Sequence, residues 1–187
     1  MNLKKILACM ILLSFSTMQA QQNQFESSLY DAIIGMNLNF FMPVENSFTF
    51  VKKNDSEFFK YDYKLVANSK EMESLIALHP IGKHPSTDYH PQIEFQRLLA
   101  NIAPNDDDQE ILVVGWDEHK LKKANADWGA EAYITPRSAI TKFKHAKLIG
   151  LFKEGSGTVI LIHCFDDPDM LPELFAFLPN ESKGHGN

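Results

Sequence analysis

The chain is poor in cysteine, and beyond its first residues it has no long apolar run. Its 187 residues include two cysteines, Cys9 and Cys164, and Cys9 lies in a segment that we expect to be removed. No intrachain disulfide can then form. No stretch after residue 20 approaches the roughly 20 consecutive apolar residues that a membrane-spanning helix needs. The sequence therefore predicts neither a disulfide-stapled scaffold nor a transmembrane segment.

The chain also has fewer basic than acidic residues. The chain has 18 lysines and arginines against 24 aspartates and glutamates. Without residues 1–20, which hold Lys4 and Lys5 and no acid, 16 basic and 24 acidic residues remain, a net charge of −8. A surface of that sign repels phosphate backbones, so nucleic acid is not expected as a partner.

The first twenty residues have the composition of a secretory signal peptide. Lys4 and Lys5 precede the apolar stretch Ile6–Phe15, and the segment closes at Ala20. This order predicts cleavage near Ala20 and export to the periplasm or the medium. Cys9 is an alternative lipid-attachment site, but the apolar stretch continues past it. Residues 21–180 then form one globular domain, followed by a flexible polar tail at 181–187.

The segment 146–165 predicts a β-hairpin. Its two apolar runs are separated by a turn that contains Gly155 and Gly157, which can adopt positive φ. In the second run, Thr158–Phe165, the residues on both faces are apolar apart from Thr158 at its start and His163. We therefore expect this strand to lie inside a sheet that is covered on both sides and has a filled interior.

Apolar periodicity predicts the remaining elements. Residues 70–78 fit either a helix or a strand, and we prefer a strand because the alternating run at 59–66 needs a neighbour. Strands are then expected at 36–42, 47–51, 59–66, 70–78, 111–114 and 130–134, and helices at 25–34, 91–102, 118–123 and 169–178. Strand 111–114 is expected to be buried. The predicted fold class is α+β, a mainly antiparallel sheet covered by helices on both faces, or α/β/α sandwich.

A loop rich in His-Pro pairs is the first candidate site. His79, His84, Asp88 and His90 fall within twelve residues, and imidazole and carboxylate groups are suitable zinc ligands. The alternative is that proline stiffens the loop and the histidines are solvated, since the spacing matches no known zinc pattern. Zinc binding at these residues is a hypothesis that elemental analysis can test.

The second candidate site surrounds Trp128. A tryptophan between Asp127 and Gly129 can form a ligand pocket, with Arg137 or Asp166 reaching in from neighbouring strand ends. The alternative is that Trp128 closes one end of the core, Asp127 caps a turn and Gly129 permits close backbone approach.

No catalytic residue is predicted. Ser156 lies in a hairpin turn and not in a strand-to-helix elbow. His163 and Cys164 are adjacent in a strand, so they point to opposite faces and cannot form a dyad. A cysteine in so apolar a strand is expected to be buried and inert.

The order of elements from Phe40-Phe41-Met42-Pro43 to Phe165-Asp166-Asp167-Pro168 resembles the PsbP-like α/β sandwich group of small exported proteins. Asn125-Ala126-Asp127-Trp128-Gly129 is similar to a stretch in uncharacterised secreted bacterial proteins. The resemblance covers Met36 to Leu178 as a pattern of elements and includes no catalytic signature. It implies an accessory or binding role and not an enzyme.

Two hypotheses about function follow. The first is an exported, non-enzymatic module that binds a protein or small ligand near Trp128 and the His-Pro loop. The second is a metal-dependent enzyme or metal-binding protein that uses His79, His84, Asp88 and His90.

Overall fold

The computed structural model of the chain describes residues 27–41, 48–51, 58–69, 71–81, 90–104, 111–167, 171 and 174–178. The predicted signal peptide, Cys9, the cleavage point at Ala20 and the tail at 181–187 lie outside the described residues. Among the helices that are described, none combines the length and the apolar character that crossing a membrane would require.

The fold is α+β with a large antiparallel sheet, as the sequence predicts. A helix at residues 27–35 comes first. The elements that follow are β1 (Leu38–Phe40), β2 (Phe48–Val51), β3 (Tyr63–Ala67), β4 (Met72–Pro80), α2 (Pro91–Ile102), β5 (Leu112–Gly115), α3 (Glu118–Ala124), β6 (Trp128–Ile134), β7 (His145–Lys153), β8 (Gly157–Phe165) and β9 (Phe175–Phe177).

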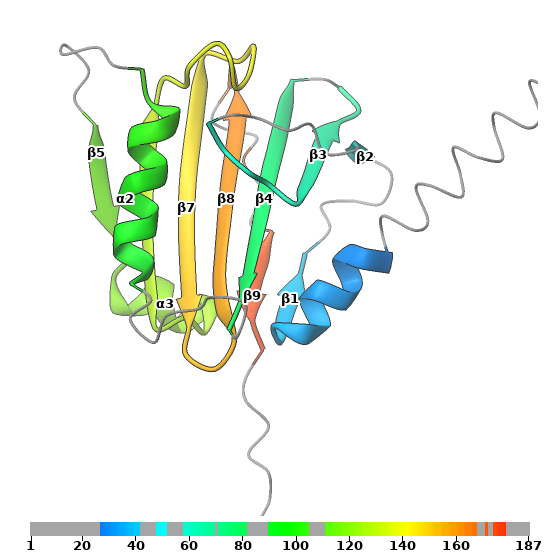
Figure 1. Cartoon of the computed structure of the whole chain (residues 1–187), viewed down its shortest axis with the longest axis vertical. Helices are drawn as coiled ribbons and strands as arrows, with labels where there is room; N and C mark the ends of the chain where they lie inside the picture. The colour runs from blue at the N-terminus through cyan, green and yellow to red at the C-terminus, as the bar shows by residue number, and fades with distance from the viewer. Residues whose placement is uncertain are drawn as a thin grey trace, which may run out of the picture.

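Seven strands form the main sheet in the order β2-β3-β4-β8-β7-β6-β5. Every neighbouring pair is antiparallel, and the long strands β4, β8 and β7 occupy the centre (Figure 1). Residues 72–78 of the segment predicted at 70–78 lie in strand β4, which confirms the choice of a strand over a helix. β1 and β9 form a separate two-stranded sheet.

Strand β8 is buried along its whole length, which confirms the prediction that both its faces are covered. It is joined to β7 by a tight turn in which Gly155 has φ 79° and Gly157 has φ 134°. L-residues with a Cβ rarely adopt such values, so glycine is needed at both positions. The turn thereby sets the register of the two central strands, Lys153 opposite Gly157 and Ala146 opposite Cys164.

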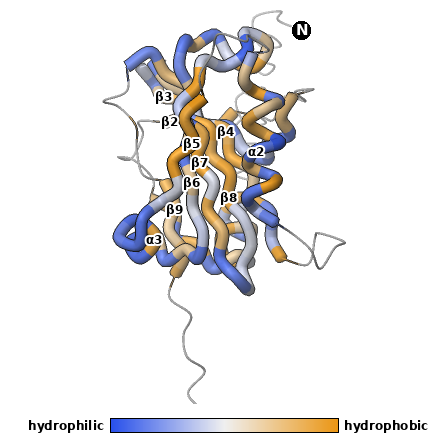
Figure 2. The backbone as a smooth tube through the Cα atoms, turned by 90° about the vertical axis from the view of Figure 1, so that its left-hand side faces the viewer, coloured by the Kyte–Doolittle hydropathy of each residue, from blue (hydrophilic) through white to orange (hydrophobic). Residues whose placement is uncertain are grey.

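Helix α2 packs on one face of the sheet (Figure 2). Pro91 occupies its first turn, where the missing N–H costs no hydrogen bond. Its buried stripe of Phe95, Leu98, Leu99 and Ile102 joins a core cluster with the side chains that β4, β7 and β8 point toward it, among them Leu75, Leu148, Ile160 and Ile162. The predicted helix 91–102 is thus confirmed, including its apolar face.

The opposite face carries a second core cluster, to which the β1–β9 pair and α3 contribute (Figure 2). Phe175 and Phe177 from β9 and Leu29 and Ile33 from helix 27–35 share this cluster with Leu161 of β8. Asp117 caps α3, because its side chain accepts a hydrogen bond from Lys120 N at 2.8 Å. The antiparallel sheet is therefore established, whereas helices as the covering layer of both faces remain a prediction.

The predicted helix is wrong at residues 175–177, and the predicted burial of strand 111–114 is wrong. Residues 175–177 are a strand and not part of a helix, since Phe40 pairs with Phe175 and Leu38 with Phe177. That pairing supplies β1 with backbone partners, and it outweighs the helical spacing of the apolar residues around it. Strand β5 is exposed at all four positions and not buried, because it lies at the edge of the sheet.

Candidate functional site

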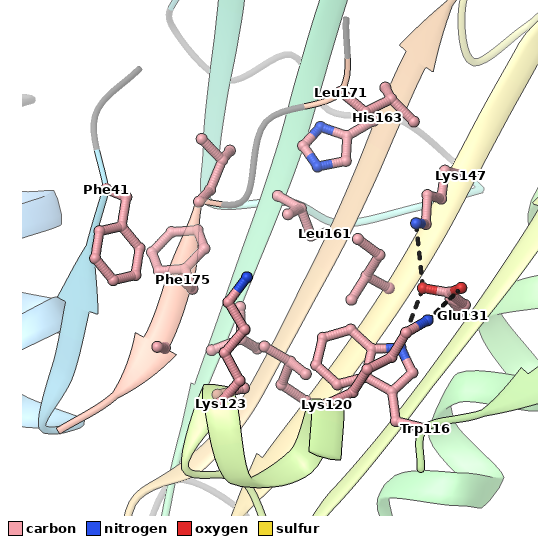
Figure 3. A pocket seen from close by; sticks show the side chains of 16 residues that line it. Phe41, Trp116, Lys120, Lys123, Glu131, Lys147, Leu161, His163, Leu171 and Phe175 are labelled. Atoms are coloured by element: carbon pink, nitrogen blue, oxygen red, sulfur yellow. Dashed lines mark hydrogen bonds and ion pairs between the residues drawn. The ribbon is translucent and has the colours of Figure 1, made fainter. Parts of the chain in front are cut away.

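The candidate site is a pocket on the sheet face opposite α2. It has a volume of about 300 Å³ and lies between β6–β8, helix α3 and the β1–β9 pair (Figure 3). We call it the β9-side pocket. Its lining includes apolar side chains, Phe41, Ile149, Leu151, Val159, Leu161 and Phe175, and polar or aromatic ones, Trp116, Lys120, Lys123, Glu131, Lys147 and His163. The interior of the fold is therefore not completely filled on this face.

Strand register determines which side chains face the pocket. Ser74, His163 and Lys147 are direct partners across β4, β8 and β7, so their side chains lie in one row on one face of the sheet. Leu161 and Ile149 follow in the next row on the same face, together with Glu131 of β6. His163, Lys147 and Glu131 thus come from neighbouring positions of β8, β7 and β6.

The imidazole of His163 is buried within this lining, with 0% of its surface exposed. Its Nδ1 lies 2.8 Å from Ser74 Oγ, which is equally buried. Its Nε2 has no hydrogen-bond partner among the described residues. A buried polar atom left without a partner costs about 1–3 kcal/mol, so this nitrogen is the least satisfied group of the site.

Glu131 is the hub of a charged cluster at the pocket wall. Its carboxylate accepts hydrogen bonds from Trp116 Nε1, Lys120 Nζ and Lys147 Nζ, each at 3.1 Å (Figure 3). Lys120 Nζ also lies over the Trp116 ring, 5.8 Å from its centroid. Gly129 lets that ring lie close to β6, because a Cβ there would be 3.0 Å from Trp116 Cδ2. The cluster fixes one wall of the pocket.

Burial and charge shift the pKa values of these groups. Burial, with a smaller contribution from the Lys147 charge, lowers the pKa of His163 from 6.5 to about 3, so the imidazole is neutral near pH 6.5. Burial alone would raise the pKa of Glu131, but hydrogen bonds from Lys120 and Lys147 more than offset it and lower that pKa. Burial alone would lower the pKa of Lys147, but its hydrogen bonds to Tyr133 and Glu131 more than offset burial and raise that pKa. Both ion-pair partners are therefore charged.

The structure does not bring Trp128, Asp127 and Arg137 together in one site. Trp128 begins β6 and Arg137 follows its end, and a seven-residue strand separates its ends by about 20 Å. Trp128 packs edge-on against Phe95 of α2, with ring centroids 5.8 Å apart. Its position matches the alternative in which it closes the core.

Asp127 and Arg137 each have a local structural contact. Asp127 Oδ2 accepts a hydrogen bond from Glu154 N at 2.8 Å, which joins the start of β6 to the β7–β8 turn. Arg137 Nε donates to Ala103 O at 2.7 Å, at the C-terminal end of α2, where a cation is favourable. Ligand binding by these residues stays a prediction without geometric support.

Only part of the zinc hypothesis falls on described residues. His84 and Asp88 lie outside them. His79 is the penultimate residue of β4, with its Nδ1 2.9 Å from Glu94 Oε1, and His90 directly precedes α2. The described residues hold no group of three or more histidine, cysteine or acidic side chains that could bind a metal ion. Zinc binding at His79, His84, Asp88 and His90 remains a hypothesis.

Among the described residues, neither the buried thiol of Cys164 nor the Ser74 hydroxyl is an activated nucleophile. Cys164 is buried on the α2 side of β8, and burial raises its pKa to about 12, so it is protonated at neutral pH. Ser74 meets His163 through Nδ1, and both are fully buried. A serine nucleophile instead bonds Nε2 of a histidine that a carboxylate orients through Nδ1. Cys164 and His163 occupy opposite faces, as predicted.

Sequence reasoning missed the β9-side pocket. Ser74, the hydrogen-bond partner of His163, is 89 residues away in the sequence. The one available signal was the polar interruption of otherwise apolar strands at Lys147 and His163. Their pairing depends on the hairpin register, which the turn length sets.

Comparison of the chain with protein-family models, with curated proteins and with solved structures finds no match. The function must therefore be argued from the site itself.

Proposed function

We propose that this protein is a non-enzymatic binding module whose ligand is a small, largely apolar molecule held in the β9-side pocket. The observation that carries the proposal is His163 Nε2, a buried polar atom without a partner in the described structure, within a largely apolar lining. Ligand sites in proteins commonly combine apolar walls with a few convergent polar groups. Ligand pockets usually have volumes of roughly 300–1,000 Å³. This pocket, at about 300 Å³, lies at the lower end of that range, so the ligand is small.

An accessory role fits this site better than catalysis. His163 is a weak base because its pKa is lowered to about 3, and Glu131 is held by three donors. Neither group is prepared to move a proton at neutral pH. The resemblance to the PsbP-like group, the α/β/α layering and export from the cell belong to the same proposal. The layering is supported by Leu29 and Ile33 of helix 27–35 and Leu121 of α3, which pack with the second core cluster.

A nuclear magnetic resonance titration with small amphipathic fragments tests the proposal. We expect shifts of backbone amides concentrated on β7 and β8 around Ile149, Leu161 and His163. The Ile149→Trp variant fills the pocket and should abolish these shifts. The matched control is Ile93→Trp, since Ile93 is 61% exposed on α2 and far from the pocket lining.

Two results would contradict the binding proposal. One is an absence of amide shifts for every fragment with the wild-type protein. The other is a set of shifts that persists unchanged in a folded Ile149→Trp variant. In either case the pocket would be a packing defect and not a ligand site.

A further inference from the structure

The tautomer of His163 follows from the hydrogen-bond donors around it. The hydroxyl of Ser74 has one proton to donate, and within the described structure its hydrogen-bond partner is His163 Nδ1. If Nδ1 carried the proton, the Ser74 hydroxyl proton would be buried without an acceptor. Ser74 therefore donates to Nδ1, and the neutral ring carries its proton on Nε2. The unsatisfied atom of the pocket is a donor, and it requires an acceptor.

The charge around that donor is positive. Lys147 is the direct cross-strand partner of His163 and is 17% exposed. Lys147 and Lys120 share a single carboxylate, Glu131, so this cluster has one positive charge in excess. That sign is opposite to the net charge of −6 of the whole chain. An anion is therefore favoured at this end of the pocket, and a cation is disfavoured.

From these contacts, and on the basis of the proposed function, we infer that the ligand is an amphipathic anion whose carboxylate or equivalent acceptor binds His163 Nε2–H and Lys147 Nζ. Its apolar part lies along Leu161, Ile149 and Val159, which follow His163 on the same face of the sheet (Figure 3). The pocket volume of about 300 Å³ corresponds to about ten water-sized groups at roughly 30 Å³ each. A medium-chain fatty acid such as octanoate has that size.

Three probes of equal chain length separate this inference from the binding proposal. Octanoate, octanol and octylammonium are titrated into the full mature chain by isothermal calorimetry. We expect octanoate to bind about tenfold more tightly than octanol, a difference of about 1.4 kcal/mol, and octylammonium to bind most weakly. Octanol binding as tightly as octanoate would overturn the inference and leave the binding proposal intact. No heat with any of the probes would overturn the inference, while the fragment titration decides the proposal independently.

Two variants test whether the charge of Lys147 is responsible for the preference for an anion. Lys147→Met should remove the preference for octanoate over octanol. Lys64→Met is a matched control, because the two lysines have similar surroundings. Lys64 is 22% exposed and paired with the buried Glu73, and Lys147 is 17% exposed and paired with Glu131. Lys64 lies in the row of Leu75 and Ile162, on the opposite face of the sheet. Equal loss of preference in both folded variants would contradict the assignment. Thermal unfolding of each variant verifies that it is folded.

Discussion

Lys147 and His163 are direct partners across strands β7 and β8, so a charged ammonium group and a buried neutral imidazole share one face of the central hairpin. On the other side of His163, Ser74 of β4 occupies the same row. The row Ser74–His163–Lys147, with Glu131 in the next row, forms the polar part of this sheet face at the pocket. We therefore expect it to influence both the stability of the fold and the selection of a ligand.

The Ser74–His163 hydrogen bond should be strongly coupled. Ser74→Ala leaves a second imidazole nitrogen buried without a partner and should lower the free energy of unfolding by about 1–3 kcal/mol. His163→Phe likewise leaves the buried Ser74 hydroxyl without a hydrogen-bond partner. The double variant removes both polar groups, so its loss should be smaller than the sum by about 0.5–3 kcal/mol. Urea denaturation of the four proteins measures this coupling, and strictly additive losses would show that the bond is not formed.

Stability should decrease as the pH falls below 6.5. In the unfolded chain His163 takes up a proton near its ordinary pKa of 6.5, whereas in the folded protein the pKa is about 3. Between these values the unfolded state binds more protons, so the free energy of unfolding should fall by up to about 1.4 kcal/mol per pH unit. The measurement is urea denaturation from pH 6.5 down to about pH 5, above the range where most carboxylates titrate. The Ser74→Ala/His163→Phe double variant should show a flatter profile, and an equal slope in both proteins would refute the assignment to His163.

Gly150 should tolerate no side chain. A Cβ at this position would lie 2.7 Å from Phe95 Cδ2 and 3.1 Å from Trp128 Cζ3, so Gly150→Ala pushes α2 and Trp128 away from the sheet. We expect a loss of about 1–3 kcal/mol in the free energy of unfolding. Gly115 is the matched control, because it lies in the same cross-strand row and a Cβ there would meet nothing within 4 Å. Similar losses for Gly150→Ala and Gly115→Ala would contradict this packing.

The β5 edge should promote self-association at high concentration. Leu112 is 72% exposed on a strand whose outer backbone groups have no partner strand within the described sheet. Such an apolar edge can pair with a second chain, and a charge blocks that pairing. Leu112→Lys should lower light scattering at high concentration with a stability change within about 0.5 kcal/mol. Ile93→Lys on α2 is the control, since Ile93 is 61% exposed but has no free strand edge. An equal effect of both substitutions would show that the strand edge is not responsible.

Local patterns in the sequence were sufficient for most elements. The period of two at Tyr63 and Leu65 and the apolar stripe beginning at Phe95 record side-chain burial within one element. Asp117 directly precedes the predicted helix at 118–123 and accepts a capping hydrogen bond from Lys120 N. These features depend on residues close together in the chain, so periodicity and capping chemistry identify them.

Features that depend on distant residues could not be predicted in the same way. Phe175 belongs to a strand because β1, more than a hundred residues earlier, pairs with it. Strand β5 is exposed because it is last in the sheet order, and an apolar run does not by itself show whether its strand is central or at an edge. The pocket arises from the register of β4, β8 and β7, which places Ser74, His163 and Lys147 side by side.

The protonation of His163 is the most direct test of the account. Nitrogen NMR of the imidazole ring identifies which nitrogen carries the proton and how that nitrogen responds to octanoate. We predict a neutral ring protonated at Nε2, with Nδ1 accepting from Ser74, and a shift of the Nε2 resonance when octanoate is added. A ring protonated at Nδ1, or an Nε2 resonance that does not move at saturating octanoate, would contradict it.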